Sequence, residues 1–249
     1  MKSVLIRWPC FRYAAPSQFY PIAGRIYPKL LWIAALLAIP GMWLGFLLCP
    51  ADAVQGEAYR IVFLHVPTSW MAMFIYMVMA FWSVIHLVFR TRLSAWMAQA
   101  LAPTGASMAL LSLWTGALWG KPMWGAWWVW DARLTSMLLL FLLYLGFIAL
   151  TRSMDDPERA DRAGSILALA GAFNVPVIYF SVYWWNTLHQ GASLAPGKAS
   201  MPSLMLLAML LLSAAAWLYG MAMSLARVRV LILQREAQTQ WVRDLQEQR

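Results

Sequence analysis

The chain has 249 residues, of which 62% are hydrophobic and only 12% are charged. A soluble domain carries about 25% charged residues, so the composition excludes an ordinary soluble enzyme and indicates an integral membrane protein. The net charge of +9 does not indicate nucleic-acid binding, because the basic residues flank apolar segments as membrane orientation signals do.

Six runs without charged residues predict six membrane spans. Each run is long enough to cross about 30 Å of hydrocarbon, which takes roughly 20 residues. The predicted helices are residues 30–49, 64–89, 98–118, 133–151, 164–186 and 203–226. We therefore expect an all-α integral membrane protein in which residues 1–249 form a single six-helix membrane domain.

The basic residues predict the orientation of this domain. An even number of spans puts both termini on one side of the membrane. Most of the 19 Lys and Arg residues fall on that side, and only Arg60, Lys121, Arg133 and Lys198 fall on the other. By the positive-inside rule, both termini and the tail 227–249 are expected in the cytoplasm. Trp241 and Leu245 in this tail are four residues apart, so the tail is either solvated or a short surface helix.

Residues 119–133 lie between two apolar runs and hold five tryptophans, namely Trp119, Trp124, Trp127, Trp128 and Trp130. Lys121, Asp131 and Arg133 exclude this stretch from the hydrocarbon, and the orientation rule predicts a loop outside the cytosol. Tryptophan is a large, flat, apolar side chain with one hydrogen-bond donor. We interpret the stretch as a platform for a planar cofactor. The alternative is an aromatic belt that anchors helix ends at the membrane surface.

The chain has three histidines, and two of them are predicted at the same non-cytosolic face. His65 precedes Pro67 at the expected start of the second span, and His189 follows Trp184 and Trp185 after the fifth. Ionisable groups at a membrane boundary are candidate functional residues, and histidine is a common axial ligand of haem iron. Each could instead be an ordinary helix-start or loop histidine. His86 lies roughly 31 Å farther along the second span, so it cannot share a metal with His65.

Three motifs together resemble the cytochrome c maturation protein C family. They are His65-Val66-Pro67, the tryptophan-rich stretch with Trp124-Gly125-Ala126-Trp127-Trp128-Val129-Trp130-Asp131 at its centre, and Trp184-Trp185-Asn186-Thr187-Leu188-His189-Gln190-Gly191. The resemblance covers nearly the whole chain except its tails. It implies a multi-pass protein of the bacterial inner membrane that binds haem at the periplasmic face. It also implies that haem passes to a periplasmic haem chaperone, cytochrome c maturation protein E.

The resemblance further implies a set of cofactor and partner contacts. His65 and His189 would be the axial metal ligands of haem b, iron protoporphyrin IX. The partners would be an ATP-binding subunit, a second membrane subunit and a small membrane subunit of one complex. The expected cofactor-binding residues are His65, His189, Trp119, Trp124, Trp127, Trp128, Trp130, Asp131, Arg60, Arg133, Trp184 and Trp185.

The charged residues of this set have different expected roles. Arg60 and Arg133, with Lys121, are the outward cations able to meet haem propionates, and arginine suits carboxylates better than lysine. Each could instead anchor to lipid headgroups. Asp131 is expected to cap the N-terminus of the fourth helix rather than to touch a propionate.

No catalytic motif is visible in the sequence. There is no G-x-x-x-x-G-K-[ST] and no nucleophile–base pair, so work driven by ATP would come from a partner. Cys10 and Cys49 flank the first span, and without a C-x-x-C motif they support neither thiol redox chemistry nor a zinc site. Two other functions stay open. One is a transporter that uses a kink at Asn174 and Pro176 in the fifth span, and the other is a structural subunit without a ligand.

Overall fold

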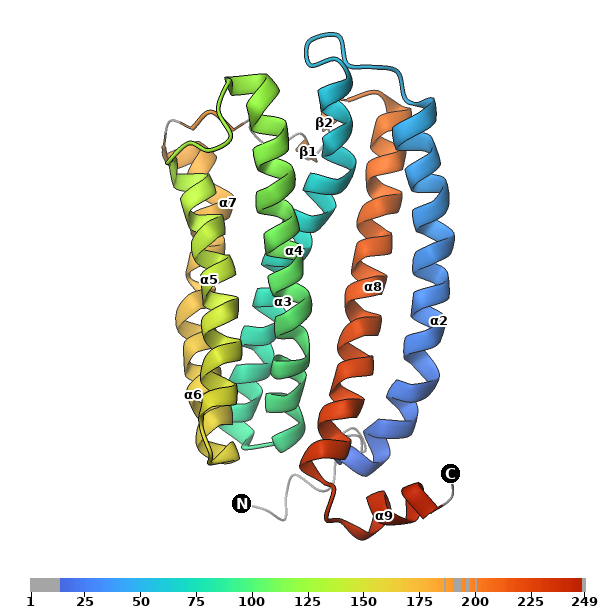
Figure 1. Ribbon diagram of the computed structural model, residues 1–249, viewed down its shortest axis with the longest axis vertical. Coiled ribbons are helices and arrows are strands. Elements are labelled where there is room, and N and C mark those ends of the chain that lie inside the picture. Colours follow the sequence, from blue (N-terminus) through green and yellow to red (C-terminus); the bar gives the residue numbers. More distant parts are fainter. Residues whose placement is uncertain (1–13, 186, 190–193, 196–197, 200, 248–249) are drawn as a thin grey trace.

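The computed structural model describes residues 14–185, 187–189, 194–195, 198–199 and 201–247. Its helices are α2 (Pro16–Trp43), α3 (Val62–Phe89), α4 (Arg92–Trp124), α5 (Ala132–Ser153), α6 (Pro157–Ala172), α7 (Asn174–Trp184), α8 (Ser203–Arg235) and α9 (Gln240–Glu247) (Figure 1). A π-helical segment, Leu44–Leu48, extends α2, and a 3-10 turn, Glu57–Ile61, leads into α3. The strands β1 (Leu194–Ala195) and β2 (Lys198–Ala199) pair antiparallel.

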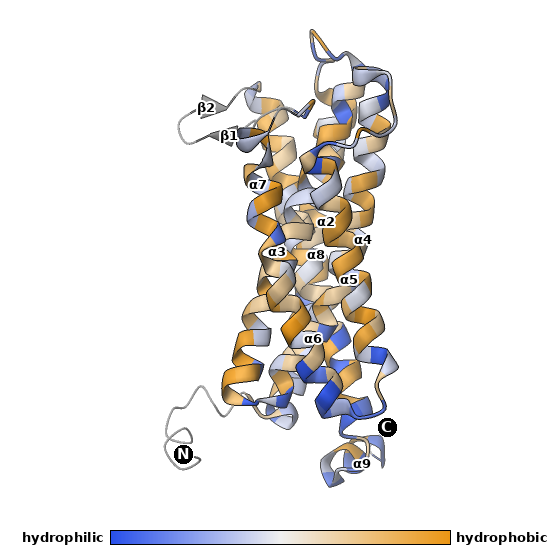
Figure 2. Cartoon of the chain, turned by 90° about the vertical axis from the view of Figure 1, so that its left-hand side faces the viewer, coloured by the Kyte–Doolittle hydropathy of each residue, from blue (hydrophilic) through white to orange (hydrophobic). Residues whose placement is uncertain are grey.

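Six helical segments are long and apolar enough to cross a membrane. They are Pro16–Leu48, Glu57–Phe89, Arg92–Trp124, Ala132–Ser153, Pro157–Trp184 and Ser203–Arg235. The backbone N–H and C=O groups of a helix hydrogen-bond to one another, so a helix does not need the hydrogen-bond partners that lipid lacks. Hydrophobic residues dominate the middle of the bundle, and hydrophilic residues gather towards its ends (Figure 2). The predicted all-α membrane protein with six spans is confirmed.

Several helices are longer than the sequence predicted. The first span begins at Pro16 rather than near residue 30, and α4 continues to Trp124 rather than ending near residue 118. Charged residues mark where a helix leaves the hydrocarbon, but helical hydrogen bonding continues because long basic side chains reach polar surroundings. Residues 119–124 therefore form the last turns of α4. The expected loop 119–133 shortens to the connection 125–131.

The helices pack in three layers (Figure 1). α5, α6 and α7 form one outer layer, α3 and α4 the central layer, and α8 and α2 the other. Both α2 and α8 have an end beside α9, and we call this the terminal end of the bundle. The start of α3, the end of α4 and the start of α5 meet at the opposite end, which we call the pocket end.

The fifth span is broken where the sequence predicted a kink. α6 ends at Ala172 and α7 begins at Asn174. The Asn174 side chain is buried, and its Nδ2 donates a 2.8 Å hydrogen bond to the carbonyl oxygen of Ser136 on α5. The break is therefore fixed to α5 by a satisfied polar contact.

The central core lies between α3, α4, α5 and α6. Tyr76 and Tyr144 are fully buried there and meet edge to face, with ring centroids 4.9 Å apart. The Tyr144 hydroxyl donates a 2.7 Å hydrogen bond to the carbonyl oxygen of Ala72 on α3. Its ring crosses α4 at Gly105, where an added Cβ would lie 2.2 Å from Tyr144 Cζ. The core therefore joins three helices on the terminal side of the candidate site.

The C-terminal segment forms the surface helix that the spacing of Trp241 and Leu245 allowed. Val242 on α9 is fully buried. Trp241 and Leu245 pack against a cluster that includes Tyr20 and Trp96. Trp241 Nε1 also donates a 2.8 Å hydrogen bond to Glu236 Oε2. α9 therefore closes the terminal end against α2 and α4.

Candidate functional site

His65 lies one turn into α3, facing α4. The helix starts at Val62, three residues before His65, because the preceding 3-10 turn already directs the chain into it. Pro67 is the sixth residue of α3 and lies inside the helix, so the Phe63 carbonyl receives no helical hydrogen bond from position 67. His65 Nδ1 lies 3.1 Å from Thr115 Oγ1 on α4, so one ring nitrogen is occupied by a neighbouring helix.

His189 approaches His65 from a different part of the chain. It follows α7 in the connection towards α8 and is half-buried. The two imidazole rings have centroids 6.1 Å apart and planes inclined at 36°. The fold therefore brings together the two histidines that the sequence placed at one face. The third histidine, His86, contacts the carbonyl of Thr91 at the far end of α3.

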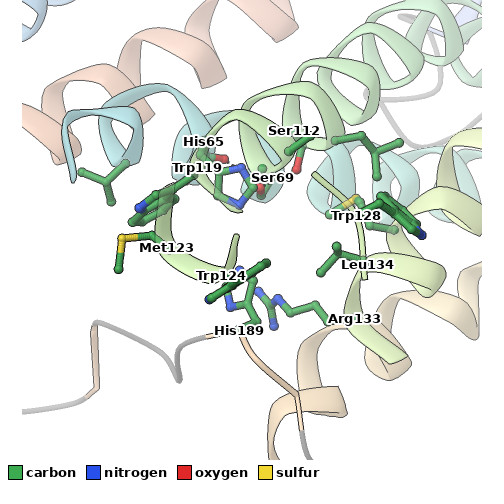
Figure 3. A pocket seen from close by; sticks show the side chains of 16 residues that line it. His65, Ser69, Ser112, Trp119, Met123, Trp124, Trp128, Arg133, Leu134 and His189 are labelled. Atoms are coloured by element: carbon green, nitrogen blue, oxygen red, sulfur yellow. Dashed lines mark hydrogen bonds between the residues drawn. The ribbon is translucent and has the colours of Figure 1, made fainter. Parts of the chain in front are cut away.

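A cavity of about 100 Å³ lies beside the two imidazoles. It is lined by Val62, His65, Val66, Ser69, Ser112, Leu113, Gly116, Ala117, Trp119, Met123, Trp124, Trp128, Arg133, Leu134, Met137 and His189. Figure 3 shows that these side chains come from α3, α4, the connection to α5, α5 itself and the segment after α7. Its wall is therefore mainly apolar, with two imidazoles, one guanidinium and two hydroxyls.

Three of the five tryptophans in the tryptophan-rich stretch line this cavity. They are Trp119 and Trp124 from the end of α4 and Trp128 from the connection that follows. The Trp119 and His65 rings meet edge to face, with centroids 5.7 Å apart. Trp119 is held from the other side because its Nε1 donates a 2.9 Å hydrogen bond to Gln55 Oε1. Its indole is thus fixed at the cavity wall.

Four other tryptophans, which the sequence analysis expected to bind the cofactor, do not line the cavity and are more than half exposed. They are Trp127, Trp130, Trp184 and Trp185. The Trp130 ring meets Trp128 edge to face, with centroids 5.4 Å apart, so it supports a cavity-lining indole from outside. Trp184 stacks on Phe180 of the same helix. These four indoles face the surroundings of the protein at the pocket end.

The two predicted arginines have different positions. Arg133 lines the cavity, points towards His189 (Figure 3) and donates a 3.2 Å hydrogen bond from Nη1 to the Ile178 carbonyl. Arg60 does not line it. Its guanidinium bonds the Glu57 carboxylate and donates a 2.9 Å hydrogen bond from Nη1 to the Gly45 carbonyl. Arg60 therefore joins α2 to α3, while Arg133 is the cation at the cavity.

The remaining charged residues of the stretch lie at its edges. Asp131 Oδ1 accepts a 2.7 Å hydrogen bond from the Leu134 N–H, which confirms the predicted cap of α5. Lys121 Nζ donates a 3.1 Å hydrogen bond to the carbonyl of Gly125 and lies 6.0 Å from the centroid of the Trp127 ring. Asp131 thus fixes where α5 begins, and with it the position of Arg133.

Polar residues on α3 and α4 form a part of the site that sequence reasoning missed. Ser69 and Ser112 line the cavity with their hydroxyl oxygens 2.6 Å apart. Thr115, one helical turn beyond Ser112, contacts the His65 ring. At Gly116 an added Cβ would lie 3.1 Å from His65 Cε1, so glycine leaves room for the imidazole. The hydroxyls at 112 and 115, three residues apart in an apolar helix, were the available signal.

The described residues contain no cluster of protein ligands for a bare metal ion. Among them, no group of three or more His, Cys, Asp and Glu side chains gathers closely enough to hold a metal ion. Cys49 is 2% exposed, and burial raises the pKa of its thiol, so the thiol stays protonated and unsuited to metal binding. Cys10 lies outside the described residues.

Comparison with known proteins finds similarity to one family over nearly the full chain. A family model described as heme exporter protein C matches residues 9–243. The heme exporter protein C of Bradyrhizobium diazoefficiens is 46% identical over 231 residues, covering 91% of this chain and 86% of that protein. The one from Escherichia coli K12 is 44% identical over 238 residues, covering 93% and 94%. The one from Haemophilus influenzae is 41% identical over 236 residues, covering 94% and 95%.

Proposed function

Because the chain belongs to the heme exporter protein C family, we propose that it binds haem b between His65 and His189 and presents it for transfer. Family membership indicates a multi-pass bacterial membrane protein with a role in haem handling for cytochrome c maturation. The axial ligands, the periplasmic face and the transfer to a chaperone are our proposal.

The observation that carries the proposal is the spacing of the two imidazoles. Metal–imidazole nitrogen bonds are about 2.0–2.1 Å for a first-row metal such as zinc. With ~1.1 Å from each nitrogen to its ring centre, two imidazoles on opposite sides of one metal have centroids roughly 6.3 Å apart. His65 and His189 have centroids 6.1 Å apart. An imidazole can rotate about its bond to the metal, so the 36° between the planes is compatible with this arrangement.

Two histidines also suit a porphyrin better than a bare metal ion. Protein metal sites built only from side chains take three or four ligands from the protein. The described residues bring no third His, Cys, Asp or Glu to this pair. Iron protoporphyrin IX supplies four nitrogens of its own and leaves two axial positions. The donor set of this cavity therefore fits haem.

The chemistry of the cavity walls suits the rest of the macrocycle. Trp119, Trp124 and Trp128 offer aromatic surface, and each such contact contributes about 0.5–1.5 kcal/mol beyond burial. Trp128 Nε1 is buried, and within the described residues it has no hydrogen-bond partner, so it is a donor available to a ligand. Arg133 supplies a guanidinium fork for a propionate carboxylate. Binding rests on these groups, and haem itself supplies the reactive chemistry when bound.

The cavity has to widen to take a ligand of this size. Its volume of about 100 Å³ is below the roughly 300–1,000 Å³ of typical cofactor and drug pockets. The lining side chains come from five separate segments, so they can separate without unfolding any helix. We expect the haem edge to enter between the end of α4 and the segment that carries His189.

The orientation follows from charge. Among the described residues, the terminal half of the bundle carries Arg25, Lys29, Arg90, Arg92, Arg152, Arg159, Arg162, Arg227, Arg229, Arg235 and Arg243. The pocket end carries Arg60, Lys121, Arg133 and, on β2, Lys198. By the positive-inside rule, the terminal end faces the cytoplasm and the cavity faces the periplasm of the inner membrane.

The partners in this proposal come from the family resemblance. The chain works in a haem-handling membrane complex. We propose that this complex contains an ATP-binding subunit, a second membrane subunit and a small membrane subunit. The indoles of Trp127, Trp130, Trp184 and Trp185 are exposed at the pocket end. They are suited to contact lipid and the periplasmic chaperone, cytochrome c maturation protein E.

Transport through the helix bundle itself is less well supported. At the break in the fifth span, the Asn174 side chain donates a hydrogen bond to the carbonyl of Ser136, so this amide is already paired. On the terminal side of the cavity, the core residues Tyr76, Leu140 and Tyr144 are fully buried and packed together. A path for a molecule as large as haem would have to separate these side chains.

The test is haem retention by histidine variants. The protein is purified from haem-replete cells, and haem per folded protein is measured by the pyridine haemochrome spectrum for wild type, His65→Ala, His189→Ala and His86→Ala. We expect loss of haem in the first two variants and retention in the third, since His86 lies at the far end of α3. Full retention in both His65→Ala and His189→Ala would contradict the proposed site.

A further inference from the structure

We propose that Thr115 is a positioning residue that sets the His65 ring as its Nδ1–H tautomer, so that the Nε2 lone pair is left for a metal. This inference rests on the proposed haem function for its purpose, but it concerns the ligand-free protein. The observation behind it is the 3.1 Å contact between His65 Nδ1 and Thr115 Oγ1, which joins α3 to α4. Thr115 is 4% exposed, so water does not compete for this contact.

The direction of this hydrogen bond follows from the other bonds of Thr115. A hydroxyl has one hydrogen to donate and two lone pairs to accept with. Thr115 Oγ1 donates to the Leu111 carbonyl at 2.7 Å, one turn earlier in α4, and has a longer 3.2 Å contact with the Ser112 carbonyl. This back-bonding is the usual arrangement of threonine inside a helix. The hydroxyl hydrogen is therefore used, and His65 Nδ1–H is the donor.

The backbone of His65 is held by a second pair of hydroxyls. Ser69 Oγ donates a 2.7 Å hydrogen bond to the His65 carbonyl. Because the Ser69 hydrogen is used there, the 2.6 Å contact between the two serines has Ser112 as the donor. α4 thus contacts the His65 ring through Thr115, and through Ser112 it contacts the Ser69 hydroxyl that bonds the His65 carbonyl. The ring has little freedom to turn Nδ1 towards the cavity.

The space around the ring agrees with this assignment. Gly116 follows Thr115, and a Cβ there would lie 3.1 Å from His65 Cε1, the atom between the two ring nitrogens. Any larger residue at position 116 would require the imidazole or α4 to shift by a few tenths of an ångström. On its other side the ring lines the cavity, with His189 6.1 Å away between centroids. Nε2 is the ring nitrogen that Thr115 does not occupy.

A neutral imidazole binds a metal through its unprotonated nitrogen, and a hydrogen bond from the other N–H makes that nitrogen more basic. Metal-binding histidines usually have such a partner, and its loss typically lowers metal affinity roughly 10–100-fold. The Ser112 carbonyl of α4 also hydrogen-bonds the His65 ring. Thr115 is the α4 residue whose side chain does so. It therefore takes the role that a carboxylate or carbonyl takes at many metal sites.

The first test reads the tautomer in the haem-free protein. Histidine labelled with ¹⁵N in the ring gives few signals, because the chain has 3 histidines. The His65 signals are assigned by their loss in His65→Ala. We expect the shifts of an Nδ1–H tautomer in wild type and Thr115→Ser, and a shift towards the Nε2–H tautomer in Thr115→Val. An unchanged His65 tautomer in Thr115→Val would overturn the inference.

A matched control separates the hydroxyl at 115 from hydroxyls in general. Thr68 also lies near His65, but its hydroxyl bonds the carbonyls of Leu64 and His65 rather than the ring. Thr68→Val should leave the His65 ring signals unchanged. Thr115→Ala is a second variant of the same contact, for use if the valine variant folds poorly. The inference is also wrong if Thr68→Val and Thr115→Val change the ring signals alike.

The second test uses haem and keeps the two proposals apart. In the haem-loaded protein we expect Thr115→Val to weaken haem binding roughly 10–100-fold and to raise the reduction potential, because a less basic ligand stabilises ferric iron less. In Thr115→Ser, the haem affinity and the reduction potential should both stay near the wild-type values. If His65→Ala loses haem but Thr115→Val changes neither tautomer nor potential, the role of Thr115 is refuted and the haem site stands. If Thr115→Val changes the tautomer but His65→Ala keeps its haem, the haem site is refuted and the tautomer assignment stands.

Discussion

The Tyr144 hydroxyl on α5 donates a hydrogen bond to the carbonyl oxygen of Ala72 on α3, with 2.7 Å between the two oxygens. To reach it, the Tyr144 ring passes Gly105 on α4. One side chain thus joins the three helices that carry His65, Thr115 and Arg133 at their pocket ends. Helix association in a bilayer depends on such close packing and on interhelical hydrogen bonds.

The first prediction concerns Gly105. In Gly105→Ala the new Cβ would lie 2.2 Å from Tyr144 Cζ, so the ring must move and its bond to Ala72 is lost. Overpacking of this kind costs about 1–3 kcal/mol. We expect a lower Tm for the purified protein in detergent. Gly146→Ala is the control, because the nearest atom to its Cβ would be Leu167 Cδ2 at 3.8 Å, an ordinary contact. Equal Tm values for the two variants would show that the Tyr144 contact does not hold the helices together.

The second prediction concerns the cap of α5. Asp131→Ala removes the acceptor for the Leu134 N–H and should destabilise the protein by about 0.5–2 kcal/mol. Asp131→Asn keeps a side-chain oxygen at this position and should destabilise the protein much less. Thermal unfolding followed by circular dichroism measures both. If Asp131→Ala were as stable as Asp131→Asn, the cap would not position the start of α5.

The third prediction distinguishes the two arginines that the sequence left equivalent. Arg133 lines the cavity, so Arg133→Gln should weaken haem binding about tenfold to a hundredfold, as expected for a lost charged hydrogen bond. Arg60→Gln should leave haem affinity nearly unchanged, since Arg60 bonds Glu57 and the Gly45 carbonyl. Haem titration of the two purified variants measures the difference. The reverse ranking would assign the propionate contact to Arg60.

These two arginines show what the sequence predicts and what it does not. Runs without charges locate six spans because charge is expensive in hydrocarbon, whatever the helices do next. The same reasoning places His65 and His189 at one face. It cannot give the rotation of each helix or the path of a connection, and these decide which side chains face the cavity. All five of these arginines and tryptophans lie at the predicted face. Arg133 and Trp128 line the cavity, whereas Arg60, Trp127 and Trp130 do not.

Helix ends and side-chain partners were missed for related physical reasons. The prediction ended α4 near residue 118 because Lys121 is charged, yet the helix continues to Trp124. A lysine at a helix end is tolerated where its amine leaves the hydrocarbon. Thr115 was not recognised because a threonine in an apolar span is usually satisfied by its own helix. Its contact with His65 depends on how α3 and α4 pack.

The fourth prediction concerns orientation. Val54 lies at the pocket end and is 88% exposed, and Asp155 is exposed at the opposite end. In a background with Cys10→Ser and Cys49→Ala, a membrane-impermeant maleimide added to spheroplasts should label Val54→Cys and not Asp155→Cys. After the cells are lysed, both variants should react. Labelling of Asp155→Cys alone in intact spheroplasts would put the cavity on the cytoplasmic side.

The most direct measurement of the central claim is the ligation state of iron in the haem-loaded wild type. Low-temperature electron paramagnetic resonance with near-infrared magnetic circular dichroism identifies the axial ligands of ferric haem. With ring centroids 6.1 Å apart, His65 and His189 predict a low-spin signal with two histidine ligands, lost in each single alanine variant. A high-spin signal in wild type, or a bis-histidine signal that persists in either variant, would contradict a single iron held between these two residues.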